Sequence, residues 1–479
     1  MRMSQIPTAA ASPNRSAWEK LETFLEKRRE ADRPVAELEV FERELHELFS
    51  AAEAEVMGEE LARFDVDAPE ILIDGIRHRR VLRCSQTYFA ASGPVEVERS
   101  LYSTRQDDEH AACPMELRAG VVEGLWTPLA AKQAAWAVAH LVPRESAEMF
   151  ELLGGMKPSR SALDELPKRL SERWEVCRPT FEKLLRAEEQ VPKEAAIVAV
   201  SLDGVLVPMK DGKRGEKRQR AAAEEQHLRG PSGYQEVGCG TLTLYDQEGE
   251  RLRTTRIARM PESKKTTLKD SLTEELAAVL RERPALKVVK IADGARDNWT
   301  FLSADLPPGY EIVDFYHAAE HLHNALGAAY GETSLKCQEQ FVKLRHVLRH
   351  DPEGVAKVIR ALAYLKSCHR RSKKITKELK YFRRNRQRMD YARMAERSLP
   401  IGSGVTEATC KTLVTQRMKR SGMRWRHEGG QAILTLRGWA QSGRFDHGWA
   451  ILVETYKQEV GLPNKVTPLP KRHMARASV

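Results

Sequence analysis

An unbroken apolar run, rich in Val and Ile, covers residues 196–209 and has the sequence AIVAVSLDGVLVPM. Such a run is typical of a strand that is buried on both faces of a sheet. Asp203 lies in its middle. The pattern therefore predicts a central strand that carries a carboxylate.

Strands and helices alternate from residue 191 onward. The predicted strands cover 197–208, 235–246, 250–259, 286–292 and Tyr310–Phe315. Helices are predicted at 266–283, in a short segment after Arg296, and in HAAEHLHNALGAAY, which follows the last strand directly. The predicted order begins with three strands that can pair antiparallel and continues with helix, strand, helix, strand and helix. This is the order of a ribonuclease-H-like core. We therefore expect an α/β fold with a ribonuclease-H-like mixed sheet, preceded by mainly helical N-terminal domains.

Two hydrophobic periodicities follow each other in the N-terminal part of the chain. Two amphipathic helical patterns lie between Trp18 and about Phe64, and the second carries an apolar stripe that packs either on the core or on another subunit. The period then changes to two in ILIDGIRHRRVLRC, where Asp74-Gly75 predicts a hairpin turn, and PVEVERSLYS predicts a further strand. Asp203-Gly204 and Asp293-Gly294 carry the same signal, so a turn is the alternative interpretation of both.

Helical patterns return after Trp126. Gly154-Gly155 separates two short helices from a third that begins near Ser159 and Arg160. This outline is compatible with a helix-turn-helix DNA reader, although many ordinary helical hairpins share it.

Seven segments follow from these patterns. A disordered leader covers 1–17, N-terminal helices with a small β-hairpin module cover 18–125, and a helix-turn-helix-like region covers 126–190. The catalytic core is predicted at 191–332 and 397–445, a basic helical insertion at 333–396, and a C-terminal tail at 446–479. Residues 210–233 form a polar, charged excursion between the first two core strands.

Composition narrows the class of protein. Lys and Arg outnumber Asp and Glu by 78 to 68, which gives a net charge of +10 and favours an anionic partner. The seven Cys are scattered without a CxxC pair, so we expect neither a structural zinc site nor disulfides. Neither a long apolar run nor a signal-peptide core is present, which predicts a cytoplasmic protein.

The densest charge lies in RRSKKITKELKYFRRNRQR at 370–388, where ten Lys and Arg residues face the single acid Glu378. Phosphate groups would neutralise such a run, and a solvated helix face is the alternative. Tyr381 and Phe382 within it could stack on bases or simply anchor the helix.

Three carboxylates suit metal-dependent phosphodiester chemistry. Asp203 and Asp293 lie on or after predicted core strands, and Glu407 lies near the start of a predicted helix. Two Mg²⁺ ions can activate water and neutralise the leaving oxygen, and such hard cations prefer carboxylate oxygens. A turn residue or a first-turn helix acid is the plainer explanation of each. A different metal chemistry is suggested by His317, Glu320 and His321, which match the HxxEH pattern of inverted zinc peptidases.

These motifs together resemble a known family. SLDGV around Asp203, ADGARDNW around Asp293, the Asp314-Phe-Tyr-His317 box, and Glu407 in GSGVTEATCKTLVTQRMKRSGMRW are similar to the D, D, DxxH and E signature of Mutator-like bacterial insertion-sequence transposases, in particular the ISKra-type group. The resemblance covers about 190–440, and the helical region 126–190 more loosely.

The resemblance implies a DDE transposase that binds terminal inverted repeats and catalyses DNA cleavage and strand transfer, as a homodimer or larger assembly on double-stranded DNA. Asp203, Asp293 and Glu407 would bind two Mg²⁺ or Mn²⁺ ions, with Asp314 and His317 in support. Relatives often carry a Cys-rich knuckle, of which only Cys113 is present here. A structure-selective nuclease and a catalytically idle DNA-binding protein are the alternatives. The expected DNA-binding residues are Ser159, Arg160, Arg370, Arg371, Lys373, Lys374, Arg383, Arg384, Arg417, Lys419, Arg420, Arg424, Trp425 and Arg426.

Overall fold

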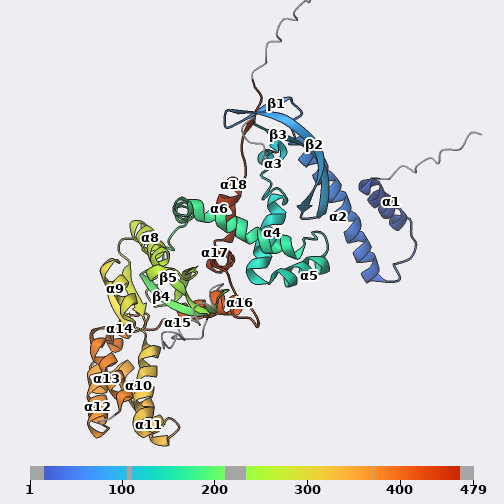
Figure 1. The fold of residues 1–479 in the computed structure, drawn as a ribbon. Coiled ribbons are helices and arrows are strands. Elements are labelled where there is room, and N and C mark those ends of the chain that lie inside the picture. The colour runs from blue at the N-terminus through green and yellow to red at the C-terminus, as the bar shows by residue number, and fades with distance from the viewer. Residues whose placement is uncertain (1–15, 105–110, 211–232, 370–371, 464–479) are drawn as a thin grey trace, which may run out of the picture. The chain divides into compact units, whose positions relative to one another are not determined.

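The structure is a computed structural model that describes residues 16–104, 111–210, 233–369 and 372–463. Its contacts divide the chain into two compact units (Figure 1). The first combines Met1–Leu166 with Trp449–Val479, and the second is Pro167–Gly448. Helices and two β-sheets are combined in the fold, so the predicted α/β class is confirmed.

The first unit contains an antiparallel sheet of order β3-β2-β1-β9. Its strands are β1 (Glu70–Ile73), β2 (Ile76–Ala90), β3 (Gly93–Ser103) and β9 (Val460–Gly461). The hairpin predicted at Asp74-Gly75 is confirmed, and both residues have positive φ, 51° and 77°. Because β2 extends over 15 residues and also pairs with β3, the sheet is larger than the small hairpin module that the sequence predicted.

This unit also contains helices, some of which pack on the sheet. They are α1 (Ala17–Arg29), α2 (Leu38–Arg63), α3 (Pro114–Ala119), α4 (Pro128–His140), α5 (Pro143–Leu153) and the start of α6 (Arg160–Ala187). The two N-terminal helices are confirmed, and Ser16 caps α1, so the helix begins at the end of the predicted leader. Phe24 of α1 stacks on Phe41 of α2 at 5.7 Å between ring centroids, so part of the apolar stripe packs within the chain.

The second unit is built on a mixed sheet of order β6-β5-β4-β7-β8. Its strands are β4 (Ile197–Pro208), β5 (Tyr234–Tyr245), β6 (Arg251–Arg259), β7 (Lys287–Ala292) and β8 (Tyr310–Val313). β4 is central, antiparallel to β5 and parallel to β7. The buried run at its start, from Ile197 to Leu202, explains its position, because both faces of this strand contact the core.

Neither Asp-Gly pair in this sheet forms a hairpin turn. Asp203 and Gly204 lie inside β4, opposite Cys239 and Gly238 of β5. Asp293 follows β7 and precedes a helix, as a connection between parallel strands requires. The turn interpretation is therefore wrong for both pairs.

Helices pack on this sheet, and all but the last of them lie at predicted places. They are α8 (Thr266–Glu282) after the short turn η1 (Ser263–Lys265), α9 (Arg296–Ala304), α10 (Phe315–Tyr330) and α17 (His427–Ser442). One boundary was wrong. Phe315 was assigned to the strand but is the first residue of α10, because the Asp314 side chain caps that helix.

The insertion between β8 and Glu407 is helical, and α10 to α13 lie together in Figure 1. It comprises α11 (Leu335–His350), α12 (Gly354–Cys368), α13 (Lys373–Arg384), η2 (Arg386–Arg388) and α14 (Tyr391–Glu396). Among the described residues of 333–396 no strand is present, as predicted. Leu379 and Phe382 of α13 belong to the same apolar cluster as β4 and β7, so the insertion is part of the core of this unit. Phe382 therefore anchors the helix, one of the two roles considered for it.

Three short elements follow the insertion, and α18 (Phe445–Glu454) crosses the division between the two units. The short elements are α15 (Gly404–Thr409), the π-helical turn η3 (Cys410–Thr415) and α16 (Gln416–Met418). The predicted tail thus begins with ordered residues. Most of the predicted excursion (211–232), the end of the tail (464–479) and the leader up to residue 15 lie outside the described residues.

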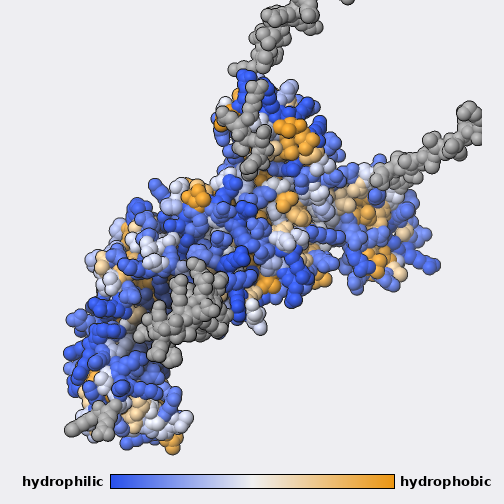
Figure 2. Space-filling view, viewed as in Figure 1, coloured by the Kyte–Doolittle hydropathy of each residue, from blue (hydrophilic) through white to orange (hydrophobic). Residues whose placement is uncertain are grey.

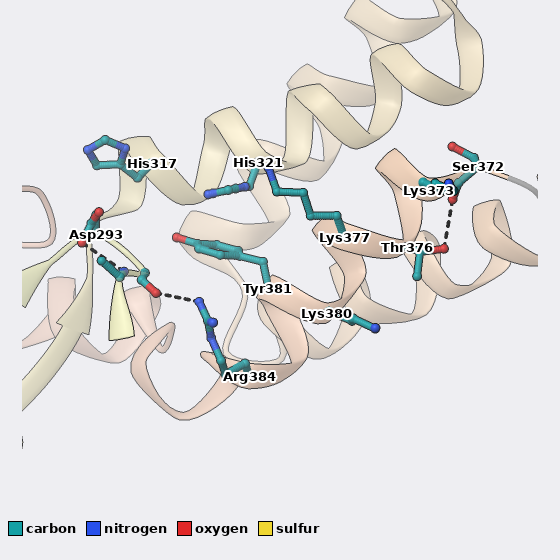
Figure 3. Close-up of a pocket in the computed structure, with 12 residues that line it drawn as sticks. Asp293, His317, His321, Ser372, Lys373, Thr376, Lys377, Lys380, Tyr381 and Arg384 are labelled. Carbon is teal, nitrogen blue, oxygen red and sulfur yellow. Dashed lines mark hydrogen bonds between the residues drawn. The ribbon is translucent and has the colours of Figure 1, made fainter. Parts of the chain in front are cut away.

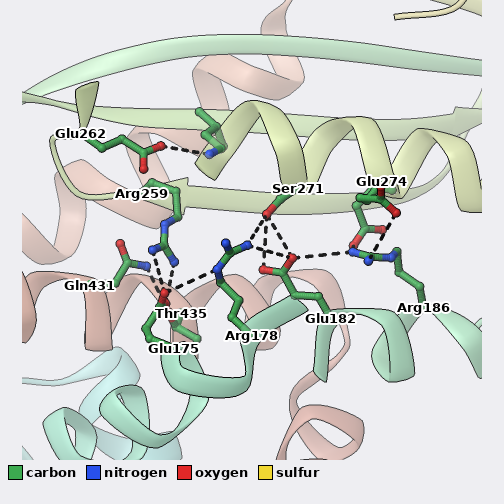
Figure 4. Close-up of polar contacts among 12 residues, drawn as sticks. Glu175, Arg178, Glu182, Arg186, Arg259, Glu262, Ser271, Glu274, Gln431 and Thr435 are labelled. Atoms are coloured by element: carbon green, nitrogen blue, oxygen red, sulfur yellow. Dashed lines mark hydrogen bonds and ion pairs between the residues drawn. The ribbon is translucent and has the colours of Figure 1, made fainter. Parts of the chain in front are cut away.

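Ion pairs join the second half of α6 to α8 and β6 (Figure 4). Arg259 of β6 donates to both carboxylate oxygens of Glu175 at 2.6 and 2.8 Å, and Arg186 lies 3.7 Å from Glu275 of α8. Within α6, Arg178 lies 3.3 Å from Glu182. Burial raises the pKa of Glu182, partly offset by Arg178. This network holds the second half of α6 against α8 and the edge strand β6.

The visible surface is mostly hydrophilic, with scattered apolar side chains (Figure 2). Within the described part of the chain, no helix combines the length and apolar character that crossing a bilayer requires.

Candidate active site

Asp203 projects from the middle strand of the sheet. Its Oδ1 accepts a hydrogen bond from the Gly204 N–H at 2.7 Å, and its Oδ2 lies 3.8 Å from the Cys410 thiol. The carboxylate is half-buried. A rigid central strand gives the positional accuracy that a metal ligand needs.

Asp293 occupies the corresponding position on the neighbouring strand. Ser201 of β4 is in register with Ile291 of β7, and the two Asp residues each follow two residues later. Asp293 Oδ1 accepts hydrogen bonds from the Ala295 N–H at 3.0 Å and Asn298 Nδ2 at 3.1 Å. The two strands therefore bring Asp203 and Asp293 to the same end of the sheet.

Asp314 connects two parts of the chain that are distant in sequence. Its Oδ1 caps α10 by accepting from the His317 N–H at 2.7 Å, and its Oδ2 accepts from the Ser403 N–H. The Phe315 N–H also donates to the Ile401 carbonyl at 3.0 Å. Because Asp314 is fully buried and both oxygens are engaged, it positions the start of α15, where Glu407 lies.

Glu407 is the acid that this connection brings to the site. Its Oε1 lies 3.7 Å from His317 Nε2, and its side chain is 47% exposed. Among the described residues, Asp314, His317 and Glu407 form the one group of three whose ligand atoms all lie within 4.8 Å of one another. Asp203 and Asp293 lie nearby but outside that group, so a cation site shared by Asp203, Asp293 and Glu407 stays a prediction.

The electrostatics of Glu407 reflect its neighbours. Burial raises its pKa first, the carboxylates of Asp314 and Asp203 raise it further, and His317 offsets part of the effect. Several acids in one place repel each other, which a cation would relieve. Two carboxylates and an imidazole can ligate a divalent cation, and oxygen donors suit Mg²⁺ or Mn²⁺.

Two buried cysteine side chains, Cys239 and Cys410, lie next to Asp203. Cys239, opposite Asp203 on β5, is buried and interacts with Cys410 of η3, and this contact and burial raise the pKa of its thiol. π-helical turns are frequent at functional sites. The sequence did not identify Cys410, because its proximity to Asp203 arises only from the packing of η3 on β4.

An open pocket of about 840 Å³ adjoins these carboxylates (Figure 3). Asp293 and His317 line one end of it, and α13 lines the other with Lys373, Lys377 and Lys380. Arg384 donates to the Gly294 carbonyl at 2.6 Å, which joins α13 to the segment after Asp293. The basic insertion thus faces the candidate site.

The remaining predicted DNA-binding residues of the insertion differ in placement. Lys374 and Arg383 are exposed and are not among the residues that line the pocket. Arg370 and Arg371 lie outside the described residues.

The basic cluster after Glu407 contains one residue that is not at the surface. Arg417 is 3% exposed, and its guanidinium lies 5.3 Å from the centre of the Trp425 ring. Its predicted role in holding phosphates is therefore corrected to packing. Trp425 donates from Nε1 to the Met418 carbonyl at 2.9 Å and packs against an apolar cluster, which favours its core role over base stacking. The remaining basic members at or near the surface are Lys419, Arg420, Arg424 and Arg426.

The HxxEH pattern does not assemble a zinc site. His321 contacts Glu378 at 2.5 Å and stacks on Tyr381 at 3.6 Å between ring centroids. Its imidazole therefore belongs to the contact between α10 and α13, and the peptidase interpretation loses its second ligand.

In the first unit, Ser159 and Arg160 are exposed where α6 begins. The Ser159 hydroxyl accepts a hydrogen bond from the Ala162 N–H at 3.1 Å and so caps the helix. Arg160 keeps the exposure that DNA contact requires.

Comparison with known proteins gives no relative: no protein-family model matches the chain, and no curated protein matches it.

Proposed function

We propose that this chain is a DDE-type transposase that binds the terminal inverted repeats of an insertion sequence and cuts and joins DNA with Mg²⁺ or Mn²⁺. The strand order, with three antiparallel strands followed by two parallel ones, is that expected of a ribonuclease-H-like core and supports the proposal. The helical insertion before Glu407 agrees with the family that the motifs resemble.

One observation carries the proposal. Acids from four separated parts of the sequence approach one end of a sheet: Asp203 and Asp293 leave neighbouring parallel strands, while Asp314 holds Glu407 beside His317. Negative charge that accumulates without a partner is costly, and burial together with the neighbouring carboxylates of Asp314 and Asp203 raises the pKa of Glu407. A role in binding divalent cations explains the arrangement.

Each group has a proposed task. Asp203, Asp293 and Glu407 would hold two divalent cations, which supply water activation and charge neutralisation at a phosphodiester. Asp314 positions Glu407, and His317 offsets the negative charge around it. The Lys and Arg residues of α13 that line the pocket and the exposed ones of 419–426 would bind the DNA backbone, and residues 126–190 would bind the inverted repeats. Two DNA ends must meet in one complex, so we propose a homodimer or larger assembly in the bacterial nucleoid.

Nicking of supercoiled plasmid tests the proposal. Wild type should nick in the presence of Mg²⁺ or Mn²⁺ and should join labelled ends to a target. Glu407→Gln should lower nicking by at least about 100-fold while DNA binding in a gel-shift assay remains. Glu396→Gln changes an exposed acid outside the site and is the matched control.

The outcomes separate three functions. Nicking with strand transfer supports a transposase, and nicking without strand transfer would indicate a nuclease. Wild type that binds DNA but never nicks it would indicate a catalytically idle binding protein. Full nicking by Glu407→Gln would contradict the assignment of Glu407.

A further inference from the structure

The wall that α13 contributes to the pocket is a row of cations. Lys373, Lys377, Lys380 and Arg384 are spaced by four, three and four residues, so they share one face of the helix and extend about 16 Å along its axis. In Figure 3 the labelled lysine side chains lie along this helix, and Arg384 is close to the segment after Asp293.

The charge of this row is not neutralised from within the helix. Glu378 is the one acid of α13, and it is buried and contacts His321 instead. Lys373, Lys377 and Lys380 have no ion pair with any acidic side chain in the described part of the chain. A row of exposed ammonium groups without acidic partners favours an anion as its ligand.

A second observation comes from Tyr381, in the same pocket. Its side chain is 93% buried, with a relative exposure of 7%, yet its hydroxyl has no hydrogen-bond partner among the described residues. Figure 3 shows the hydroxyl directed toward Asp293 and His317. A buried hydroxyl without a partner costs about 1–3 kcal/mol, so its persistence indicates a ligand that accepts from it.

The surroundings of Tyr381 hold its ring in place. One face stacks on His321, and a Cβ added at Gly294 would lie 2.1 Å from Tyr381 Cε2. Burial raises the pKa of the phenol, and Asp293 and Asp314 raise it further, so the hydroxyl stays protonated and can donate.

We propose that Tyr381, Lys377 and Lys380 form a phosphate-binding subsite that receives the backbone of a DNA strand next to the phosphodiester to be cut. The Tyr381 hydroxyl donates to a non-bridging phosphate oxygen, and the lysines bind the phosphates that follow along α13. This inference rests on the proposed function and adds to it the position of the strand.

Photocrosslinking locates the strand directly. A thymidine hexanucleotide with one 4-thiothymidine, bound to the full chain in EDTA, should crosslink to residues 373–384 as mapped by mass spectrometry. Lys377→Ala/Lys380→Ala should lower the affinity by about tenfold and the slope of log affinity against log salt by about 1 to 2. Lys374→Ala, on the same helix but away from the pocket, should change the affinity less than twofold.

Tyr381→Phe removes only the hydroxyl and keeps the ring, so it should fold like the wild type. It should weaken hexanucleotide binding about three- to tenfold without changing the salt slope, because a hydrogen bond and not a charge is lost. Crosslinks elsewhere, wild-type binding by Tyr381→Phe, or an equal loss in Lys374→Ala would overturn the subsite.

These results are independent of cleavage. Binding at α13 by a chain that never nicks DNA would support the subsite and contradict the proposed enzyme. If the chain nicks DNA while its Lys377→Ala and Tyr381→Phe variants bind the hexanucleotide as wild type does, the proposed enzyme is supported and the subsite is contradicted.

Discussion

Opposing electrostatic effects act on the Glu407 side chain. It lies 3.7 Å from His317, while Asp314 and Asp203 act on it as like charges. Burial and these neighbours raise its pKa, so the folded protein holds this proton more tightly than the unfolded chain does. Without a cation, ionised Glu407 therefore opposes folding.

The sign of this effect can be tested in EDTA. At about pH 3, well below the unfolded pKa, the thermal unfolding temperatures of Glu407→Gln and wild type should agree, because Glu407 is protonated in both the folded and the unfolded state. As pH rises through the interval between the unfolded and the raised folded pKa, wild type should become less stable than Glu407→Gln. The side chain is about half exposed, so solvent screening limits the difference to about 2 °C.

Divalent cations should make wild type more stable than Glu407→Gln. Millimolar Mn²⁺ should raise the unfolding temperature of wild type at pH 7.5 but leave that of Glu407→Gln nearly unchanged, because binding to the folded state stabilises it. An unfolding temperature of wild type that is indifferent to Mn²⁺ would contradict a cation site at Glu407.

Gly294 is needed because the Tyr381 ring occupies the space of a side chain. In Gly294→Ala the added Cβ would lie 2.1 Å from the ring, so we expect a loss of about 1–3 kcal/mol in the free energy of unfolding. Gly404→Ala is the control, since nothing lies within 4 Å of a Cβ there. Urea denaturation should leave the control equal to or more stable than wild type. Equal stability of both variants would show that Tyr381 is not held against Gly294.

At the scale of elements, the site depends on one connection. The start of α10 and the segment 401–403 are joined by hydrogen bonds to the Asp314 carboxylate and from the Phe315 N–H. Together with the buried hydrogen bond between Thr406 of α15 and Thr241 of β5, at 2.7 Å, they place Glu407 beside His317. Asp314 therefore belongs to the site although both of its carboxylate oxygens already accept hydrogen bonds.

Asp314→Ala should therefore destabilise the protein by more than the loss of an ordinary helix cap does. It removes the cap of α10 and leaves the Ser403 N–H buried without a partner, so we expect about 2–4 kcal/mol by urea denaturation. Ser334→Ala removes the partly buried cap of α11 and should cost about 1 kcal/mol. Similar losses in the two variants would contradict the connecting role of Asp314.

The sequence predicted elements well where one local pattern decides the structure. The apolar run around Asp203 and the alternation at Asp74-Gly75 each contain their own signal, and the structure agrees. Arg417, Cys410 and Tyr381 could not be predicted in this way. The place of Cys410 depends on Asp203, which is distant in sequence, and a charge pattern does not distinguish a buried Arg such as Arg417 from a surface one.

At the scale of the whole molecule, the excess of Lys and Arg is distributed over surfaces that the proposed function would use. The net charge is +10, and exposed basic residues occur in both units, at Arg160, along α13 and in 419–426. Charge of this kind gives affinity for DNA without sequence preference, whereas specificity needs contacts to base edges.

Arg160 is the residue predicted to contribute specificity. Arg160→Ala should lower affinity for the element's inverted repeat by about tenfold and for random duplex by less than threefold, measured by fluorescence anisotropy at fixed salt. Arg144→Ala, an exposed Arg of α5, is the control. Equal losses on both duplexes would assign Arg160 to backbone contact only.

The central claim is that Asp203, Asp293 and Glu407 hold cations together, and counting bound Mn²⁺ by electron paramagnetic resonance tests it most directly. Wild type should bind two Mn²⁺ ions per chain, and Asp203→Asn, Asp293→Asn and Glu407→Gln should each lose at least one. Wild type that binds none, or three variants that bind as many ions as wild type, would contradict it.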